Sequence, residues 1–255
     1  MKKTLIAAAV VALSFSSAAN AAFTSTIDLF TTNQAQITDN TAGGNYVMTQ
    51  VGSAIDTSIL GGYRDLGVNM LSSDGNPSQI SKADVFNGVM SFSNDASVSG
   101  TGLVRWDGAN TGLAINTTGL GGISLLGNAF SLRILSSDLG FRFDLEAYTD
   151  ATHWSKITLV SNAHATPVNS IIGFDSFGLC GFDNLAGLTV TCGAAGAVDF
   201  LNLGALQAVI DPLGASTSVD LRIGQVTTVP EPASLALVGL GLLGVGALRR
   251  RRTAK

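Results

Sequence analysis

Apolar and polar residues alternate one by one through much of this chain, most clearly between residues 141 and 148. Neighbouring side chains of a β-strand point to opposite faces, so the pattern predicts a strand with one buried and one solvated face. We expect the segment from Gly140 to Thr149 to bury Phe141, Phe143 and Leu145 and to expose Arg142, Asp144 and Glu146.

A second alternating segment precedes the first. Phe130, Leu132 and Ile134 recur at every second position, and a polar run at residues 136–138 follows. The two segments are therefore predicted to form an antiparallel hairpin.

Further short strands are expected at residues 25–30, 45–51, 67–71, 85–93, 97–106, 154–160, 188–192, 206–210 and 218–223. Short strands separated by Gly- and Asn-rich turns are typical of an all-β fold, and we predict an antiparallel, jelly-roll-like β-sandwich. A parallel β-helix is the alternative, but no fixed repeat period is present.

The segment from residue 22 to residue 226 disfavours helices, because Glu146 is its only glutamate and lysine is rare. It carries seven basic and seventeen acidic side chains, a net charge of −10. Affinity for nucleic acid comes largely from Lys and Arg, so a nucleic-acid partner is excluded. The same charge argues against binding to anionic membrane surfaces.

The N-terminus has the layout of a secretory signal peptide. Lys2 and Lys3 precede an apolar run from Leu5 to Leu13, and residues 19–21 read Ala-Asn-Ala. This A-x-A pattern, with Ala19 and Ala21 as its small residues, predicts cleavage before Ala22. Residues 1–21 would form a signal helix that engages the Sec translocon and signal peptidase. An N-terminal membrane anchor is the alternative, but the apolar run is only about half of the ~20 residues that span a bilayer.

The C-terminus has three consecutive parts. Pro230, Glu231 and Pro232 come first, and an uncharged apolar stretch occupies residues 233–248. As a helix the stretch would be about 24 Å long, slightly short for a ~30 Å hydrocarbon core, but snorkelling arginines can make up the difference. Four arginines follow, namely Arg249, Arg250, Arg251 and Arg252. By the positive-inside rule they would hold residues 249–255 in the cytoplasm.

This tail closely resembles the PEP-CTERM sorting signal. The resemblance implies that an exosortase, a membrane cysteine peptidase, reads Pro230-Glu231-Pro232 and processes the tail. It also implies a Gram-negative bacterium that makes exopolysaccharide. We expect a domain at residues 22–226, a linker with the motif at 227–232, a membrane helix at 233–248 and a basic tail at 249–255. The product would be anchored in the inner membrane in transit and then reach the cell surface or extracellular matrix.

Cys180 and Cys192 are the only cysteines of the chain. Because disulfides form in the oxidising compartments that an exported protein enters, we predict that these two residues are bridged.

No catalytic site is evident. A triad would need His153 or His164, the only histidines, beside an activated serine, and no G-x-S-x-G elbow occurs. Many aspartates could pair as in a glycosidase, but the sequence singles out no pair. We expect a protein without enzymatic activity, with a secreted polysaccharide hydrolase as the alternative.

No metal or other cofactor is expected. Asp74-Gly75, Asp107-Gly108 and Asp138 fall at predicted turns, where aspartate side chains bond to nearby backbone. The alternative is calcium, which takes oxygen ligands from loops, and it would make the domain a calcium-braced adhesion module.

Aromatic rings offer a route to carbohydrate binding, because flat rings stack on sugar faces. The candidates are Tyr46, Tyr63, Trp106, Tyr148 and Trp154, with Tyr148 on the polar face of its strand. Core packing is the more common use of such residues in β domains.

Two charged runs, residues 61–66 and 103–108, resemble segments of uncharacterised surface proteins that carry similar tails. That resemblance implies a β-sandwich and no activity. If their charges face inward, the runs would form a buried ion pair at a strand end.

With a sorting tail and no evident active site, we expect an exported matrix protein associated with exopolysaccharide or biofilm.

Overall fold

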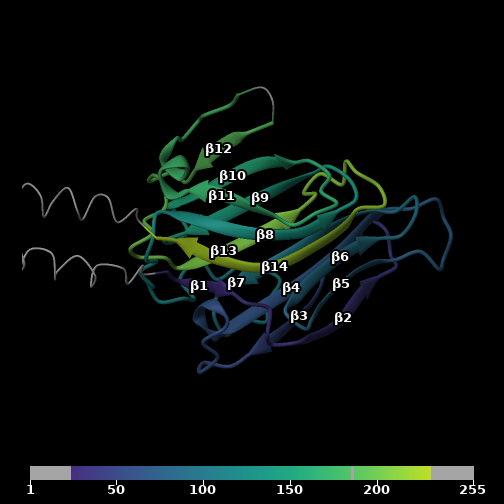
Figure 1. The fold of residues 1–255 in the computed structure, drawn as a ribbon, viewed down its shortest axis with the longest axis horizontal. Coiled ribbons are helices and arrows are strands. Elements are labelled where there is room, and N and C mark those ends of the chain that lie inside the picture. The colour runs from purple at the N-terminus through teal and green to yellow at the C-terminus, as the bar shows by residue number, and fades with distance from the viewer. Residues whose placement is uncertain (1–23, 185–186, 231–255) are drawn as a thin grey trace, which may run out of the picture. The chain divides into compact units, whose positions relative to one another are not determined.

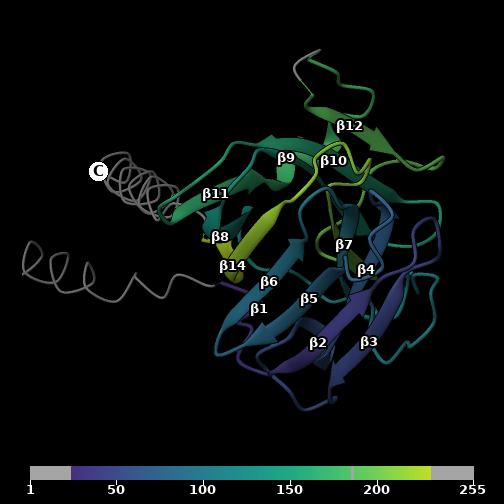
Figure 2. The same ribbon diagram turned by 90° about the vertical axis from the view of Figure 1, so that its right-hand side faces the viewer.

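The computed structural model of this protein describes residues 24–184 and 187–230, and Ser25–Val229 forms one compact unit. Its strands form two sheets, seen in Figure 1 and in Figure 2. The first sheet has the order β11-β8-β14-β6-β5-β2, and β1 also pairs with β14. Its strands are β1 (Thr26–Asp28), β2 (Gln34–Asp39), β5 (Ser81–Phe86), β6 (Val89–Asn94), β8 (Ala129–Ser137), β11 (Val168–Gly173) and β14 (Asp220–Val229).

The second sheet has the order β12-β10-β9-β13-β7-β4-β3. Its strands are β3 (Val47–Gly52), β4 (Tyr63–Ser72), β7 (Ser99–Trp106), β9 (Phe141–Tyr148), β10 (Trp154–Ser161), β12 (Thr189–Cys192) and β13 (Ala205–Ile210). Two 3₁₀ helices, η1 (Leu60–Gly62) and η2 (Phe174–Gly178), complete the described elements.

The predicted all-β class and antiparallel sandwich are confirmed. Every pairing between these strands is antiparallel, which excludes the parallel β-helix. The apolar faces of the two sheets meet in one core that includes Phe92, Phe130, Leu145 and Leu206.

Strand β9 has the predicted register. Phe141, Phe143 and Leu145 are buried as predicted, whereas Arg142 and Glu146 on the other face are half-buried rather than exposed. The expectation that Asp144 is exposed was wrong, because it is only 6% exposed. It accepts a 2.6 Å hydrogen bond from the Thr158 hydroxyl and lies 3.5 Å from the Lys156 ammonium. These cross-strand partners from β10 cover the carboxylate and compensate its burial.

The predicted hairpin between β8 and β9 was wrong. Strand β8 lies between β11 and β14 in the first sheet, and β9 lies between β10 and β13 in the second. Both strands are amphipathic, and they place their apolar faces in the common core instead of pairing edge to edge. The connection at residues 138–140 therefore crosses from one sheet to the other.

Residues 85–93, expected as one strand, belong to two strands. Strands β5 and β6 form a hairpin that turns at Asn87 and Gly88, whose φ angles are 50° and 78°. Asn-Gly is the preferred pair for a two-residue turn with positive φ at both positions. Strands β2 and β11 were not anticipated from the sequence.

Strand β14 also corrects the predicted linker at residues 227–232. Thr227, Thr228 and Val229 continue the strand and pair with β8, and Thr228 is buried. The described chain thus reaches Pro230 directly from a central strand. The predicted signal helix and membrane helix lie outside the described residues. Within the described residues, no helix has the length and apolar character needed to cross a membrane.

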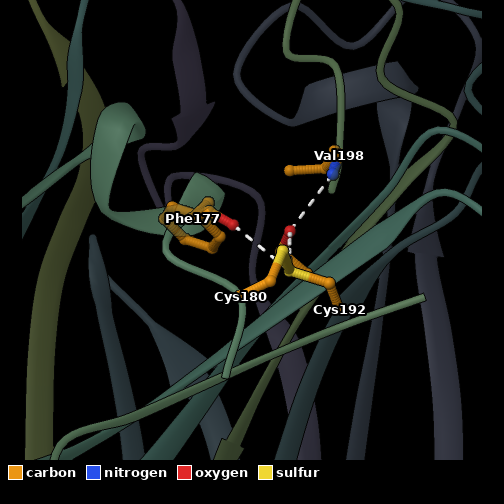
Figure 3. Close-up of a disulfide and its surroundings, with 5 residues drawn as sticks. Phe177, Cys180, Cys192 and Val198 are labelled. Atoms are coloured by element: carbon orange, nitrogen blue, oxygen red, sulfur yellow. Dashed lines mark hydrogen bonds between the residues drawn. A yellow bond between two sulfur atoms is a disulfide. The ribbon is translucent and has the colours of Figure 1, made fainter. Parts of the chain in front are cut away.

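The predicted disulfide between Cys180 and Cys192 is confirmed, with a Cα–Cα distance of 5.4 Å (Figure 3). It fastens the chain after η2 to the edge strand β12. Ser155 lies between this bridge and the next loop, since its hydroxyl is 3.6 Å from Cys192 Sγ and accepts a hydrogen bond from the Val198 amide. Closing a loop of this size stabilises the fold by about 3 kcal/mol in the chain-entropy model.

An ion pair crosses the core between the two sheets. Arg64 of β4 donates two hydrogen bonds to the Asp28 carboxylate of β1, at 3.0 and 3.1 Å, and neither side chain is exposed to solvent. Arg64 also donates to Gln34 Oε1 at 2.9 Å and to the Thr32 carbonyl at 2.7 Å. Trp106 Nε1 of β7 donates to Asp28 at 2.9 Å. The expected inward-facing ion pair therefore exists, but Arg64 pairs with Asp28 and not with its sequence neighbour.

We predict that Arg64→Met lowers the free energy of unfolding by about 3–5 kcal/mol, because it leaves Asp28 buried without its partner. The double variant Arg64→Met/Asp28→Ala should lose less than the sum of the two single variants. Urea unfolding of the four proteins measures both values. Strict additivity would contradict the coupling.

We also predict that Phe143→Ala lowers the free energy of unfolding by about 3–5 kcal/mol through loss of a core side chain. Arg142→Ala, on the opposite face of β9, should cost about 0.5 kcal/mol or less. Equal losses in thermal or urea unfolding would contradict the register of this strand.

Candidate binding face on the second sheet

A row of polar side chains crosses the outer face of the second sheet. Each member lies directly opposite its neighbour in the strand register, and the row uses six consecutive strands. From β3 to β10 its members are Gln50, Asp65, Arg105, Gln207, Glu146 and Lys156. We call these six residues the polar row. Because residues opposite one another across an antiparallel pair are close, the six side chains lie side by side across the sheet.

Hydrogen bonds join the centre of the polar row. Arg105 Nε donates to Gln207 Oε1 at 3.1 Å, and Gln207 Nε2 donates to Glu146 Oε2 at 2.7 Å. The same Glu146 oxygen accepts a 2.6 Å bond from the Tyr148 hydroxyl. Burial and the adjacent Glu146 carboxylate raise the pKa of Tyr148, so its hydroxyl stays a donor. Side chains from three strands, β7, β13 and β9, thus form one hydrogen-bonded network that includes Arg105.

The loop at residues 107–118 covers one half of the polar row. Arg105 donates to the carbonyls of Gly112 and Leu113, at 3.4 and 3.1 Å. Asp107 Oδ2 accepts hydrogen bonds from Asn110 Nδ2 and the Asn116 amide, at 2.8 and 2.7 Å. The base of the loop is tightly closed, because a Cβ on Gly119 would collide with the Asp107 carbonyl oxygen.

The other half of the face, over β9, β13 and β10, carries an aromatic pair. Tyr148 and Trp154 are opposite residues of β9 and β10, and their ring centroids lie 6.0 Å apart with a 33° angle between the planes. Both are half-buried, as are Glu146 and Lys156 beside them. Apolar ring faces next to a carboxylate and an ammonium are suited to a ligand that has both C–H surfaces and hydroxyl groups.

Two carboxylates meet under the covering loop. Asp65 and Asp107 are 2% and 1% exposed, and Asp107 lies within hydrogen-bonding reach of Asp65. Asp65 Oδ2 and Asp107 Oδ1 are buried and have no hydrogen-bond donor. Burial, followed by the negative charge of Asp107, raises the pKa of Asp65 to about 7.

The other sequence-predicted candidates separate into three groups. Pro230 is the last described residue, and Glu231, Pro232, the arginines 249–252 and Ala19, Ala21 and Ala22 lie outside the described residues. Trp106 is a core residue and not a surface ring. The aspartates of the predicted turns do bond to backbone, since Asp74 accepts from the Asn76 amide and Asp138 from the Asp220 amide.

The histidines form no catalytic arrangement. His153 is exposed, and its ring lies 3.0 Å from Asp150, three residues away. His164 exchanges main-chain hydrogen bonds with Ser137. Among the described residues, no three or more His, Cys, Asp or Glu side chains form a group that could hold a metal ion.

The sequence did not indicate that Asp28 is the partner of Arg64, or that Asp65 contacts Asp107. The inward direction of Arg64 could have been predicted, because residues 64, 66 and 68 of one strand point to the same face and Leu66 and Val68 are apolar. No sequence rule, however, named its partner 36 residues away.

The model of the PEP-CTERM protein-sorting motif matches residues 228–252. The chain carries a PEP-CTERM sorting tail. The match begins within β14 and covers the predicted proline motif, apolar stretch and arginines. A PEP-CTERM tail marks an exported protein that is anchored in the membrane in transit and processed by an exosortase.

The solved structures that are similar to this sandwich have low sequence identity to it. The family 11 carbohydrate-binding module of the cellulosomal cellulase Lic26A-Cel5E of Clostridium thermocellum matches with a TM-score of 0.40 and 10% identity, over 83% of this chain and 97% of the module. A family 29 carbohydrate-binding module matches with a TM-score of 0.33 and 10% identity, over 79% of this chain and 93% of the module. The structure of PfGH50B matches with a TM-score of 0.38 and 7% identity, over 65% of this chain and 22% of the PfGH50B chain. Scores this low transfer no function, and no curated protein matches the chain.

The raised pKa of Asp65 predicts a pH dependence of stability in metal-free buffer. The folded-state pKa of about 7 exceeds the ordinary value of 3.8, so the folded protein holds a proton that the unfolded chain has released. Stability should therefore fall as the pH rises from 4 to 7 and level off above that range. Urea unfolding at several pH values tests this. Asp65→Asn should flatten the decline, whereas the control Asp39→Asn, at a buried aspartate of β2, should not.

Proposed function

We propose that this protein is an exported, non-catalytic component of the cell surface or extracellular matrix that associates with exopolysaccharide or biofilm. The observation that carries the proposal is the sorting motif at residues 228–252, placed directly after the last strand of the sandwich. The signal peptide expected at residues 1–21, with cleavage before Ala22, would deliver the chain to the translocon and signal peptidase. The exosortase would then act on Pro230-Glu231-Pro232 in a Gram-negative envelope.

The outer face of the second sheet supports an association with polysaccharide. Tyr148 and Trp154 present neighbouring, partly exposed rings, and the half-buried Glu146 and Lys156 supply hydrogen-bonding groups beside them. A sugar ring would pack its C–H face on the aromatic pair and bond its hydroxyl groups to the Glu146 carboxylate and the Lys156 ammonium. Because the strands are fixed in the sheet, these groups are in place before a ligand arrives.

The alternative of a polysaccharide hydrolase receives less support from the same face. A glycosidase needs two carboxylates that flank the scissile bond and can reach it. Asp65 and Asp107 are close together, but both are buried under the 107–118 loop. Glu146 is more accessible, yet its neighbours in the polar row are Gln207 and Lys156.

The sorting proposal predicts that Pro230→Ala/Glu231→Ala/Pro232→Ala and a deletion of residues 233–255 both change the processing of the protein. The variants remove the expected recognition motif and membrane segment, respectively. Mass spectrometry of both termini, with fractionation of cells and medium, measures the change in a strain that has a working exosortase. Wild-type size and location in both variants would refute sorting.

The carbohydrate proposal predicts that Trp154→Ala weakens binding of the exported protein to the producing strain's exopolysaccharide by about 10-fold, since stacking on one ring is worth about 1–1.5 kcal/mol. Phe86→Ala is a matched control, because Phe86 is an exposed aromatic residue of the first sheet. Affinity electrophoresis compares the three proteins. Equal retardation of wild type and Trp154→Ala would contradict the proposed face.

A further inference from the structure

The contact between Asp65 and Asp107 is not neutralised by a direct ion pair. Two buried carboxyl oxygens, Asp65 Oδ2 and Asp107 Oδ1, have no hydrogen-bond donor although their side chains lie within hydrogen-bonding reach of each other. None of the ion pairs among the described residues involves either carboxylate. Arg105, the register neighbour of Asp65, donates instead to Gln207 and to the loop carbonyls. Burial of two facing negative charges is costly, so a proton or a metal ion must lie between them.

The surroundings of this contact are rich in oxygen. Gln50 Nε2 lies 3.0 Å from Asp65 Oδ1, 3.1 Å from the Gly108 carbonyl oxygen and 2.8 Å from the Asn110 carbonyl oxygen. An amide nitrogen has two hydrogens, so three acceptors exceed what it can satisfy. The two carbonyls belong to the same loop as Asp107, and together with Asp65 Oδ1 they converge on the Gln50 amide nitrogen. Carboxylate and carbonyl oxygens from a loop are the ligands that calcium takes.

The orientation of the Gln50 side chain provides the last ligand. Rotating its amide by half a turn exchanges Nε2 for Oε1, and the two orientations have nearly the same shape. The rotated amide would add a further oxygen to the shell and would be unfavourable there without a cation. Two carboxylates, two main-chain carbonyls and one amide oxygen would then surround one point.

We propose that a divalent cation of the calcium type bridges Asp65 of β4 and Asp107 of the 107–118 loop, with Gln50, Gly108 and Asn110 as further oxygen ligands. The ion neutralises the buried carboxylates and fastens the loop to the outer face of the second sheet. Calcium is favoured over magnesium because the donors are mainly protein oxygens of irregular geometry, whereas magnesium retains several waters in an octahedral shell.

The experiment uses the exported protein, stripped with EDTA and studied at pH 8, above the titration of Asp65. Isothermal titration with CaCl₂ should show one site, and CaCl₂ at 100 times the measured Kd should raise Tm by about 5–10 °C. MgCl₂ should produce a smaller shift. No heat of binding and no change in Tm with CaCl₂ would overturn the proposal in favour of a shared proton.

Two variants separate the cation from a shared proton. Asp65→Asn should abolish the response to CaCl₂ if the ion is bound there, and the control Asp39→Asn should keep it. In the shared-proton case, Asp65→Asn would instead raise Tm at pH 8 above that of the stripped wild type, with no response to CaCl₂ in either protein. A calcium response that persists in Asp65→Asn would place the ion elsewhere and refute the site. If Asp65→Asn does not fold, Gln50→Leu serves, because it removes one ligand and should weaken calcium binding by about 10-fold or more.

Discussion

The ion pair between Arg64 and Asp28 connects the two sheets through the apolar core. Arg64 comes from β4 of the second sheet, and Asp28 comes from β1, which pairs with β14 of the first. Trp106 and Gln34 bond to the same two side chains from β7 and β2. A hydrophobic interface alone would allow the sheets to slide past each other, whereas charged hydrogen bonds with fixed directions define one relative position. The outer face of the second sheet depends on this arrangement, because β4 and β7 also carry Asp65 and Arg105.

Sequence patterns were sufficient for the class of fold and for the register of individual strands. The alternation at Phe141, Phe143 and Leu145 reports which face of β9 meets the core, since burial of apolar side chains is a local property of a strand. The Asn87-Gly88 turn could also have been recognised, because its sequence is the preferred one for a tight hairpin. The apolar run over residues 85–93 obscured it.

Pairing between strands was not predictable in the same way. Strands β8 and β9 follow one another and both alternate, yet they do not pair with each other. One of the two partners of each, β14 for β8 and β13 for β9, lies more than fifty residues later in the chain. The candidate binding face could not be predicted for the same reason. Gln50, Asp65, Arg105, Gln207, Glu146 and Lys156 become neighbours only through strand order, so no spacing in the sequence indicated the polar row. The sorting tail is different, because its recognition depends on a short continuous segment and could be predicted from the sequence alone.

The position of β14 affects the timing of folding during export. Strands β11 and β8 lie on one side of it in the first sheet, and β6, β5 and β2 lie on the other. Until β14 is available, the first sheet consists of two separate pieces, each with an unpaired edge of the kind that promotes aggregation. Under the proposed export from the N-terminus, β14 would emerge last, immediately before the sorting tail. The sandwich would then close only when translocation has reached the tail, and membrane anchoring would coincide with the pairing of the two edges that β14 joins.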